Sequence, residues 1–378
     1  MSSPHTFVPG FRLRRTEENS DEIDELAERL GGRAGLDVLL ADLNRKARRS
    51  AWALGRAVDR AFRWERSDTL TKRWWPQGIT TSADAFGADG DQRRLAVVTW
   101  YSKKVDGINK GSRLTFVDLD TLRYRHVLLV VPVRDKDGRM SLKPLKVHAG
   151  GIVWAGPYLH IAATGKGFMT CRVDDILRIP DDHGIRDRGL LTYPGADSDE
   201  KVSTFGYRYV LPVRFSYRAD TDEGLGRLRY SFMSIDRSGP SPQLVVGEYG
   251  RGTSSTRLAR FAMDPESMHL VIGGDGHSGP AMLADPGIMG MQGIAVVEDT
   301  FHITTSNGPF LPGSVYVGHV APGAAARFRR FRWATPIGCE DLSYWPSGTD
   351  GGAFWSVTEH PLRRWVFTMK RSWFAERA

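Results

Sequence analysis

The stretch Trp74-Trp75-Pro76-Gln77-Gly78-Ile79-Thr80-Thr81 returns in weaker form three times along the chain. The related segments are HAGGIVW at 148–154, MQGIAV at 291–296 and CEDLSY at 339–344. Each opens a series of short segments that are rich in β-branched and aromatic residues and separated by turn residues. The recurrence therefore divides the chain after residue 70 into similar units.

The first unit contains four strand-like segments, which are residues 77–86, 95–102, 113–119 and 124–131. Further units start near residues 148, 207, 292 and 340. Successive four-stranded meanders are typical of a β-propeller, in which each meander forms one blade. We predict an all-β protein with a five-bladed β-propeller, and six blades are the alternative count.

The residues before the first unit have a helical pattern. Ser20 is a candidate N-cap, and apolar side chains follow at helical spacing from Ile23 to Leu30. A second pattern covers residues 36–47, and a third starts at Ser50 and carries Leu54, Val58 and Phe62 on one face. We predict that residues 1–66 form an N-terminal extension with an α-helical arm packed on the body, and that residues 67–378 form the propeller.

Composition narrows the choice of partners. The 378 residues are 41% hydrophobic, enough to fill a core, and the formal net charge is +8. The arginines at 45–49 and 327–332 come without a recognised nucleic-acid-binding motif, so we expect solvated surfaces and no nucleic-acid partner. Cys171 and Cys339 have no metal-ligand spacing, which predicts two buried thiols, with one long-range disulfide as the alternative.

Targeting signals are not evident. The first ten residues lack a continuous apolar core, and no run of 18 apolar residues occurs. The expectation is a cytoplasmic protein without stable membrane association, and secretion is the alternative if the N-terminus is processed. The oligomeric state is left open.

The repeated segments also predict a site. In a propeller the first strand of each blade lines the central channel. When Gly78, Gly151, Gly293 and Asp341 are aligned, the residues directly before them occupy equivalent positions on these inner strands. Side chains two residues apart on a strand share a face, so the residues two positions earlier, which include His148, point the same way. We expect four side chains to converge on the central channel, with Tyr209 or Arg214 from the third unit completing the ring: Gln77, His148, Gln292 and Glu340.

Three phrases of the sequence resemble a known group of proteins. They are WWPQGITTSADAFG, RLTFVDLDTLRYRHVLLVVP and VHAGGIVWAGPYLHIAATGKG, all within residues 60–180. They resemble an actinobacterial family that is often labelled only as secreted proteins. The resemblance implies one propeller-like body and transfers no catalytic residue. This chain departs from the secreted pattern because it lacks an evident signal segment, so we expect an intracellular role, for instance in bacterial specialised metabolism.

The channel set can support acid/base chemistry. His148 titrates near neutral pH, and Glu340 would face it as a carboxylate, with Gln77 and Gln292 as neutral hydrogen-bond donors. We therefore predict an enzyme of the cyclase, lyase or hydrolase type that transforms a small-molecule substrate, with His148 and Glu340 as the catalytic groups. The alternative is that these polar side chains only bind water and plug the channel.

Other hypotheses about cofactor and function depend on additional residues. We predict no firm cofactor, and a divalent metal, if one is bound, would use His148, Glu340 and Asp84. A glycosidase needs two carboxylates, and Asp84 with Glu340 is the only evident pair. A non-catalytic propeller that binds a ligand or glycan is the alternative function, with Trp75, Trp100, Tyr101 and Trp154 as a stacking rim. His277, in the glycine-rich segment 273–279, is a candidate substrate contact.

Overall fold

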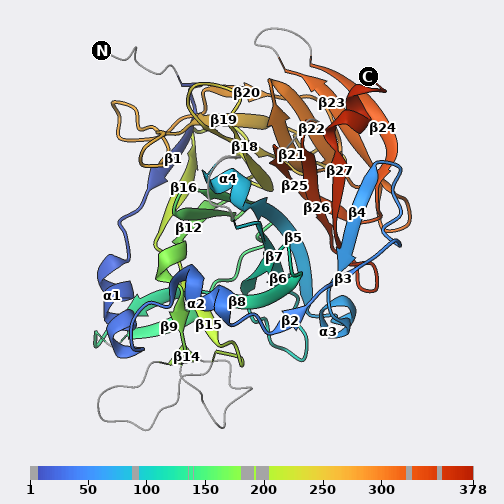
Figure 1. Cartoon of the computed structure of the whole chain (residues 1–378). Coiled ribbons are helices and arrows are strands. Elements are labelled where there is room, and N and C mark those ends of the chain that lie inside the picture. The colour runs from blue at the N-terminus through green and yellow to red at the C-terminus, as the bar shows by residue number, and fades with distance from the viewer. Residues whose placement is uncertain are drawn as a thin grey trace.

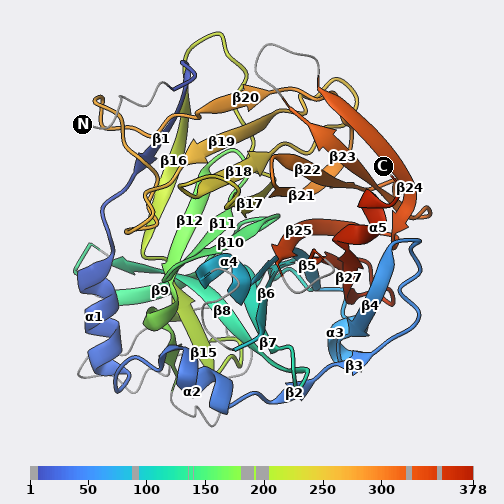
Figure 2. The ribbon, with the colours of Figure 1, turned by 45° about the horizontal axis from the view of Figure 1, so that its top comes forward.

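The protein is an all-β propeller. The computed structural model describes residues 7–86, 93–134, 136–138, 140–179, 191–192, 204–320, 326–346 and 351–377. The described strands form five sheets that radiate from a common centre (Figures 1 and 2). None of the helices in these ranges is long and apolar enough to cross a membrane.

The five sheets follow one another along the chain, apart from strands contributed by the N-terminal region and from three strands of the first sheet. The first contains β2 (Arg45–Lys46), β5 (Trp74–Thr81), β6 (Leu95–Ser102), β7 (Ser112–Asp118), β8 (Arg123–Arg134), β9 (Met140–Pro144), β13 (Leu177–Arg178), β14 (Leu191–Thr192) and β15 (Tyr209–Pro212). The second contains β1 (Phe11–Arg15), β10 (Ile152–Ala155), β11 (Tyr158–Ala162), β12 (Gly167–Arg172) and β16 (Phe215–Thr221). Strands β13, β14 and β15 return to the first sheet after the second has begun.

The other three sheets are simpler. The third contains β17 (Phe232–Asp236), β18 (Gln243–Gly247), β19 (Leu258–Ala262) and β20 (Met282–Ala284). The fourth contains β21 (Met291–Val297), β22 (Thr300–Thr305), β23 (Gly313–His319) and β24 (Arg327–Thr335). The fifth contains β3 (Arg48–Arg49), β4 (Val58–Arg63), β25 (Cys339–Trp345), β26 (Ala353–Thr358) and β27 (Trp365–Lys370).

The helices are short. They are α1 (Ser20–Arg29), α2 (Gly35–Ala41), α3 (Arg66–Leu70), α4 (Ser82–Phe86), the 3-10 turn η1 (Val173–Asp175) and α5 (Arg371–Ala375). Helix α4 lies near the centre beside the inner strands β5, β10 and β25 (Figure 2). It corrects the predicted strand 77–86, because Asp84 accepts hydrogen bonds from the Thr80 hydroxyl and the Thr81 amide and so stabilises a helical turn at the end of β5.

Apolar side chains fill the space between neighbouring sheets. Trp64 and Phe62 of the fifth sheet region pack with Ile79 and Trp100 of the first, and comparable buried clusters lie between each following pair of sheets. Both faces of most strands are therefore covered, and β6 is buried at seven of its eight positions. This explains why its sequence LAVVTWYS is almost continuously apolar rather than alternating.

The repeated glycines lie where inner strands approach one another closely. A Cβ atom at Gly78 would lie 2.8 Å from the carbonyl carbon of Gly151, and one at Gly151 would lie 2.4 Å from the Met233 nitrogen. The same holds at Gly293, where a Cβ atom would lie 2.5 Å from the Leu342 nitrogen. Glycine at this level lets β5, β10, β17, β21 and β25 gather around the centre.

The predicted N-terminal helical arm is not confirmed as a unit. Helices occur at α1 and α2, but the predicted helix after Ser50 is wrong, because β4 pairs with β27 of the last sheet. Val58 and Phe62 are four residues apart, a spacing that fits a helix face, yet pairing with an open sheet edge satisfies the backbone of this segment instead. The N-terminal region thus joins the C-terminal strands (Figure 1).

The predicted third unit starts too early. Strand β15 runs parallel to β8 in the first sheet, and β16 pairs with β12 in the second, so the inner strand of the third sheet is β17. Cys171 and Cys339 are both buried free thiols, as expected, and no disulfide joins them.

Candidate functional site

A pocket of about 620 Å³ lies at one end of the inner strands. The start of each inner strand and the end of the strand beside it contribute to its wall, because these two ends meet in an antiparallel hairpin. Trp75 pairs with Tyr101 in this way, and Glu340 and Glu359 follow the paired residues Cys339 and Thr358. All five sheets therefore reach this channel pocket.

Register shifts aim polar side chains at the channel. The pairing of inner strands with their neighbours is interrupted between Pro76 and Ile79, between Met291 and Gly293, and between Cys339 and Leu342. These irregularities lie at Gln77, Gln292 and Glu340, all of which line the pocket. A β-bulge re-aims a side chain that regular alternation would direct elsewhere, so the three bulges help to form this polar wall.

The structure brings together five of the predicted site residues. Trp75, Gln77, His148, Gln292 and Glu340 all line the channel pocket. The amide Nε2 of Gln292 lies 3.3 Å from Glu340 Oε1. Their chemical roles remain predictions.

Three other predicted substrate contacts lie elsewhere. Trp154 is 1% exposed, packs between the first and second sheets, and donates its indole N–H to the Gly156 carbonyl. The hydroxyl of Tyr209 donates to Asp42, and Arg214 pairs with Glu18 and Asp175. These two predictions fail because β15 and β16 are outer strands.

His277 and Asp84 are also outside the channel pocket. His277 lies in the turn before β20, with its Nδ1 2.9 Å from the Asp275 carbonyl oxygen. Asp84 is buried and accepts hydrogen bonds from the Thr80 and Ser343 hydroxyls. His148, Glu340 and Asp84 therefore do not form the suggested ligand set, and no group of three His, Cys, Asp or Glu side chains within the described ranges could hold a metal ion.

Sequence reasoning missed a second carboxylate. Glu359 follows β26, and its Oε2 accepts a hydrogen bond of 3.0 Å from the Gln77 amide. Other missed pocket residues also follow second strands: Lys103, Tyr249, Arg251 and His360. Tyr101, which was predicted as part of a stacking rim, lies near the end of β6 and also lines the pocket. Hairpin pairing within each predicted meander was the available signal, since the end of a second strand lies beside the start of the first.

The two carboxyl groups have different surroundings. Burial raises the pKa of Glu340 well above its usual range, and the nearby Glu359 and Asp341 carboxylates raise it further. Burial also raises the pKa of Glu359, but the Gln77 hydrogen bond and the positive charges of Lys103, Arg364 and Arg251 oppose that increase. Glu340 is therefore the better proton donor of the pair, and Glu359 is the better carboxylate.

Arg364 forms a hydrogen bond with the backbone of Glu359. Its side chain is fully buried, its Nε donates to the Glu359 carbonyl oxygen at 2.8 Å, and its Nη1 donates to the carbonyls of Asp68 and Thr71. Burial lowers the pKa of Arg364 to about 10, so the guanidinium stays charged at neutral pH. It fixes the backbone at Glu359 and places a cation beneath the carboxylate.

Aromatic and basic groups complete the wall. The Lys103 ammonium lies 3.1 Å from the centre of the Trp75 ring, and the ring centres of Tyr101 and His148 are 4.5 Å apart. Burial and the Lys103 charge lower the pKa of His148. His148 is therefore a neutral imidazole at pH 7 and can donate or accept a hydrogen bond.

No protein-family model matches the sequence, and no curated protein is significantly similar to it. Among solved structures, a thermostable family-43 glycoside hydrolase is 11% identical, with 79% of this chain and 90% of that chain covered and a TM-score of 0.38. The RS223 beta-xylosidase is 9% identical, with 78% and 92% covered and a TM-score of 0.33. A beta-xylosidase/alpha-arabinofuranosidase from a compost microbial metagenome is 10% identical, with 84% and 94% covered and a TM-score of 0.33. Likenesses of this size do not assign a reaction to the chain.

The environment of Glu340 predicts a pH-dependent difference in stability. A carboxyl group whose pKa is raised by folding binds its proton more tightly in the folded state, so it lowers the stability as the pH rises above the unfolded value of about 4.5. The Glu340→Gln variant lacks this titration. The variant should therefore gain stability relative to the wild type as the pH rises. The difference between its free energy of unfolding and that of the wild type should be larger at pH 8 than at pH 5 by about 1 kcal/mol or more.

Urea denaturation at both pH values measures this difference. Glu266→Gln, at an exposed position, is the matched control and should show no comparable pH dependence. Equal pH dependence in the Glu340→Gln variant and the wild type would contradict the raised pKa.

Proposed function

We propose that the protein is a hydrolase that cleaves a small, polar, sugar-like substrate in the channel pocket. The proposal rests mainly on one observation: the neighbouring carboxyl groups of Glu340 and Glu359 line the same pocket in contrasting electrostatic environments. Two carboxyl groups with separated pKa values can serve as an acid and a base on one substrate. Glycoside hydrolysis is the reaction class that most often uses such a pair.

In the proposed reaction, the Glu340 carboxyl group protonates the oxygen of the leaving group. The Glu359 carboxylate acts on the opposite partner, either by removing a proton from the attacking water or by attacking the sugar carbon itself. Gln77 holds Glu359 through its 3.0 Å hydrogen bond, and Gln292 orients Glu340. Trp75 and Tyr101 provide flat surfaces against which a sugar ring can stack.

We also infer that each of the five sheets is one blade. Each sheet contributes an inner strand, and β5, β10, β17, β21 and β25 contact one another in a closed order, with β25 next to β5. Buried apolar clusters between successive sheets support the same count. In this arrangement β4 completes the blade that β25, β26 and β27 begin, so the two end regions of the chain close the ring.

The test is a panel of chromogenic aryl glycosides and aryl esters. If the wild-type protein hydrolyses a glycoside, Glu340→Gln and Glu359→Gln should each lower kcat/KM by about a hundredfold or more. Glu266→Gln is the matched surface control and should keep wild-type activity. Hydrolysis that survives both pocket substitutions would overturn the assignment.

A non-catalytic glycan-binding protein is the second candidate, favoured by the aromatic side chains of Trp75, Tyr101 and Tyr249 in the pocket wall. In that case sugars should bind without being cleaved, and Trp75→Ala should weaken the affinity while Glu340→Gln leaves it nearly unchanged. Calorimetric titration with mono- and oligosaccharides separates this outcome from the hydrolase.

A further inference from the structure

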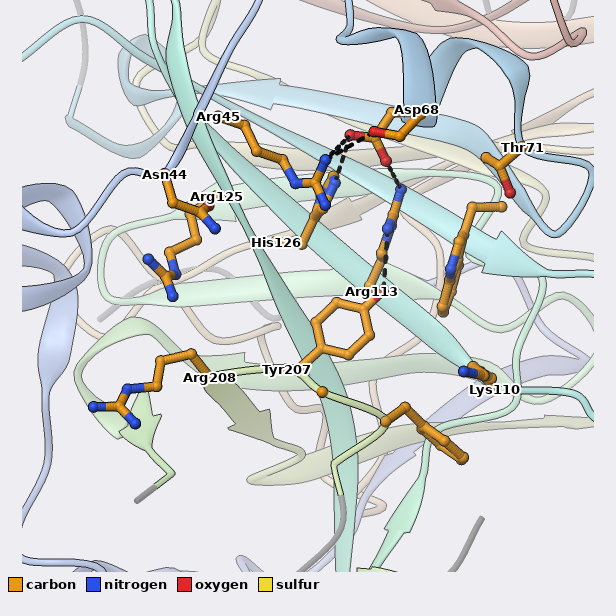
Figure 3. A pocket seen from close by; sticks show the side chains of 14 residues that line it. Asn44, Arg45, Asp68, Thr71, Lys110, Arg113, Arg125, His126, Tyr207 and Arg208 are labelled. Atoms are coloured by element: carbon orange, nitrogen blue, oxygen red, sulfur yellow. Dashed lines mark hydrogen bonds and ion pairs between the residues drawn. The ribbon is translucent and has the colours of Figure 1, made fainter. Parts of the chain in front are cut away.

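A larger pocket, of about 820 Å³, lies beside the channel pocket, and we refer to it as the lateral pocket. The two pockets meet at a common rim, because five residues line both of them: Tyr249, Arg251, Ser306, Gly308 and Pro309. By contrast, Figure 3 shows a pocket of about 330 Å³ around Arg113 and Tyr207 that shares no lining residue with either. Of these two neighbours, the lateral pocket is therefore the one that extends the channel.

The common rim is fixed by the fold and open at one point. The Gly290 N–H donates to the Gly250 carbonyl, and the Ser306 N–H donates to the Gly290 carbonyl, each at 3.0 Å. These bonds join the segments that follow β18, precede β21 and follow β22. A Cβ atom at Gly308 would meet no atom of the described residues within 4 Å beyond its chain neighbours. A ligand can therefore cross the rim at Gly308 without displacing a side chain there.

The wall of the lateral pocket away from the channel is one face of the fourth sheet. Tyr316 of β23 is directly paired with Arg330 of β24, and Phe328 lies two residues before Arg330. Paired residues and residues two apart on a strand share a face of the sheet. Tyr316, Phe328 and Arg330 accordingly line the pocket together, whereas the intervening Arg329 does not.

Hydrogen bonds hold Arg330 in this wall. Its Nε donates to the Ser314 hydroxyl at 3.2 Å, and its Nη2 donates to Asn307 Oδ1 at 3.1 Å. Asn307 is itself fixed, since its Nδ2 donates to the Pro312 carbonyl at 2.6 Å. The guanidinium carbon of Arg330 lies 5.6 Å from the centre of the Tyr316 ring. The wall thus presents an ordered hydrogen-bond donor beside a flat aromatic ring, and a sugar unit offers hydroxyl groups to the first and an apolar ring face to the second.

The two pockets differ in what they can do. Each has the volume of a complete small-molecule site, so a ligand that occupies both is longer than a single sugar unit. Aromatic side chains occur along the whole path, because Tyr249 lines both pockets and Tyr316 lies beyond the rim. The described residues that line the lateral pocket include no carboxylate, unlike Glu340 and Glu359 in the channel. The lateral pocket is therefore suited to binding and the channel pocket to cleavage.

We propose that the lateral pocket binds the extension of an oligosaccharide whose end lies in the channel pocket. This inference rests on the proposed hydrolase and deepens it, because it makes the substrate a chain of several sugar units. One unit would lie beside Glu340 and Glu359, the chain would cross the rim at Gly308, and a distal unit would lie against Tyr316 and Arg330. Because the rim and the Arg330 wall are held by hydrogen bonds within the fold, ordering them costs the ligand little binding energy.

The test is isothermal titration calorimetry on the full chain carrying Glu340→Gln, which slows cleavage under the proposed mechanism. The probes are the mono-, di- and pentasaccharides of xylan, arabinan, cellulose and polygalacturonan. In at least one of these series, the pentasaccharide should bind about tenfold or more tightly than the disaccharide. Adding Arg330→Ala should remove about tenfold of pentasaccharide affinity and with it most of the gain with chain length, because a charged hydrogen-bond donor is lost from the distal wall.

Arg329→Ala is the matched control, because Arg329 is the exposed neighbour on the same strand and does not line the lateral pocket. It should leave the gain with chain length unchanged. The proposal is overturned if no series binds more tightly as the chain lengthens, if Arg330→Ala leaves the gain intact, or if Arg329→Ala removes as much of it as Arg330→Ala.

Hydrolysis by the wild-type protein is measured separately on the same oligosaccharides and on aryl glycosides. A gain in affinity with chain length that depends on Arg330, without any cleavage, would contradict the hydrolase and support the lateral site. Cleavage of aryl glycosides without any effect of chain length on binding would contradict the lateral site and support the hydrolase. The failure of one proposal is therefore distinguishable from the failure of the other.

Discussion

Replacing Asp68 with alanine is expected to lower the free energy of unfolding by about 3–5 kcal/mol, because the change leaves a buried guanidinium without its carboxylate. Asp68 is 4% exposed and receives Tyr124 at 2.7 Å, and Arg113 and His126 each at 3.0 Å. The substitution leaves all three buried donors without the acceptor that Asp68 provides. Urea denaturation monitored by tryptophan fluorescence measures the loss.

Asp120→Ala is the matched control for this experiment. Asp120 pairs with Arg94 at 3.0 Å, but both side chains are more than half exposed, so the change should have little effect. The pH dependence provides a second check. Since folding holds the pKa of Asp68 below its usual value, its stabilisation is present above about pH 4 and is lost as the pH falls through the folded pKa. Similar losses for the two variants at neutral pH would contradict the buried network.

Replacing Asp341 with alanine is also expected to cost about 3–5 kcal/mol, because two buried amides lose their acceptor. The carboxylate of Asp341 is fully buried at the level where other inner strands carry glycine. One oxygen accepts hydrogen bonds from Ile79 N at 3.3 Å and Ile152 N at 3.2 Å. A single side chain of β25 thus links β5 and β10 across the centre.

Asp341→Asn separates the role of the acceptor from that of the charge. Burial raises the pKa of Asp341 well above its usual range and thus favours the neutral carboxylic acid, whose shape and polarity an amide nearly reproduces. The asparagine variant should remain within about 1 kcal/mol of wild type, since its oxygen can still accept from both amides. If asparagine destabilises as much as alanine in thermal or urea unfolding, the proposed bridging role is wrong.

The channel residues could be predicted because they belong to a repeated local pattern. The glycine that permits close approach is visible in the sequence at Gly78, Gly151 and Gly293, and the polar residues next to it follow from alignment. Gln77 and Glu340 were located in this way. Glu359 was not, because its position depends on which residue of β26 pairs with the start of β25, and a bulge shifts that register.

Two errors have a common physical cause. Val58 and Phe62 fit a helix face locally, yet the segment pairs with β27, about 300 residues later in the chain. Tyr209 has the strand propensity expected of an inner strand, but β15 pairs in parallel with β8 instead. In both cases a sheet edge that is distant in the sequence provides the backbone hydrogen bonds. Local periodicity cannot predict such a distant pairing partner.

Local sequence was thus sufficient for the β architecture and for five of the polar and aromatic residues at the channel, because strand periodicity and close-packed glycines are short-range properties. The Glu340 and Glu359 pair depended on the closed arrangement of the sheets. Arg364 illustrates the difference, since it donates to the Asp68 and Glu359 carbonyls from a segment that is distant from Asp68 in the chain. Burial and neighbouring charge set the pKa of each of these groups, and both exist only once the sheets have packed together.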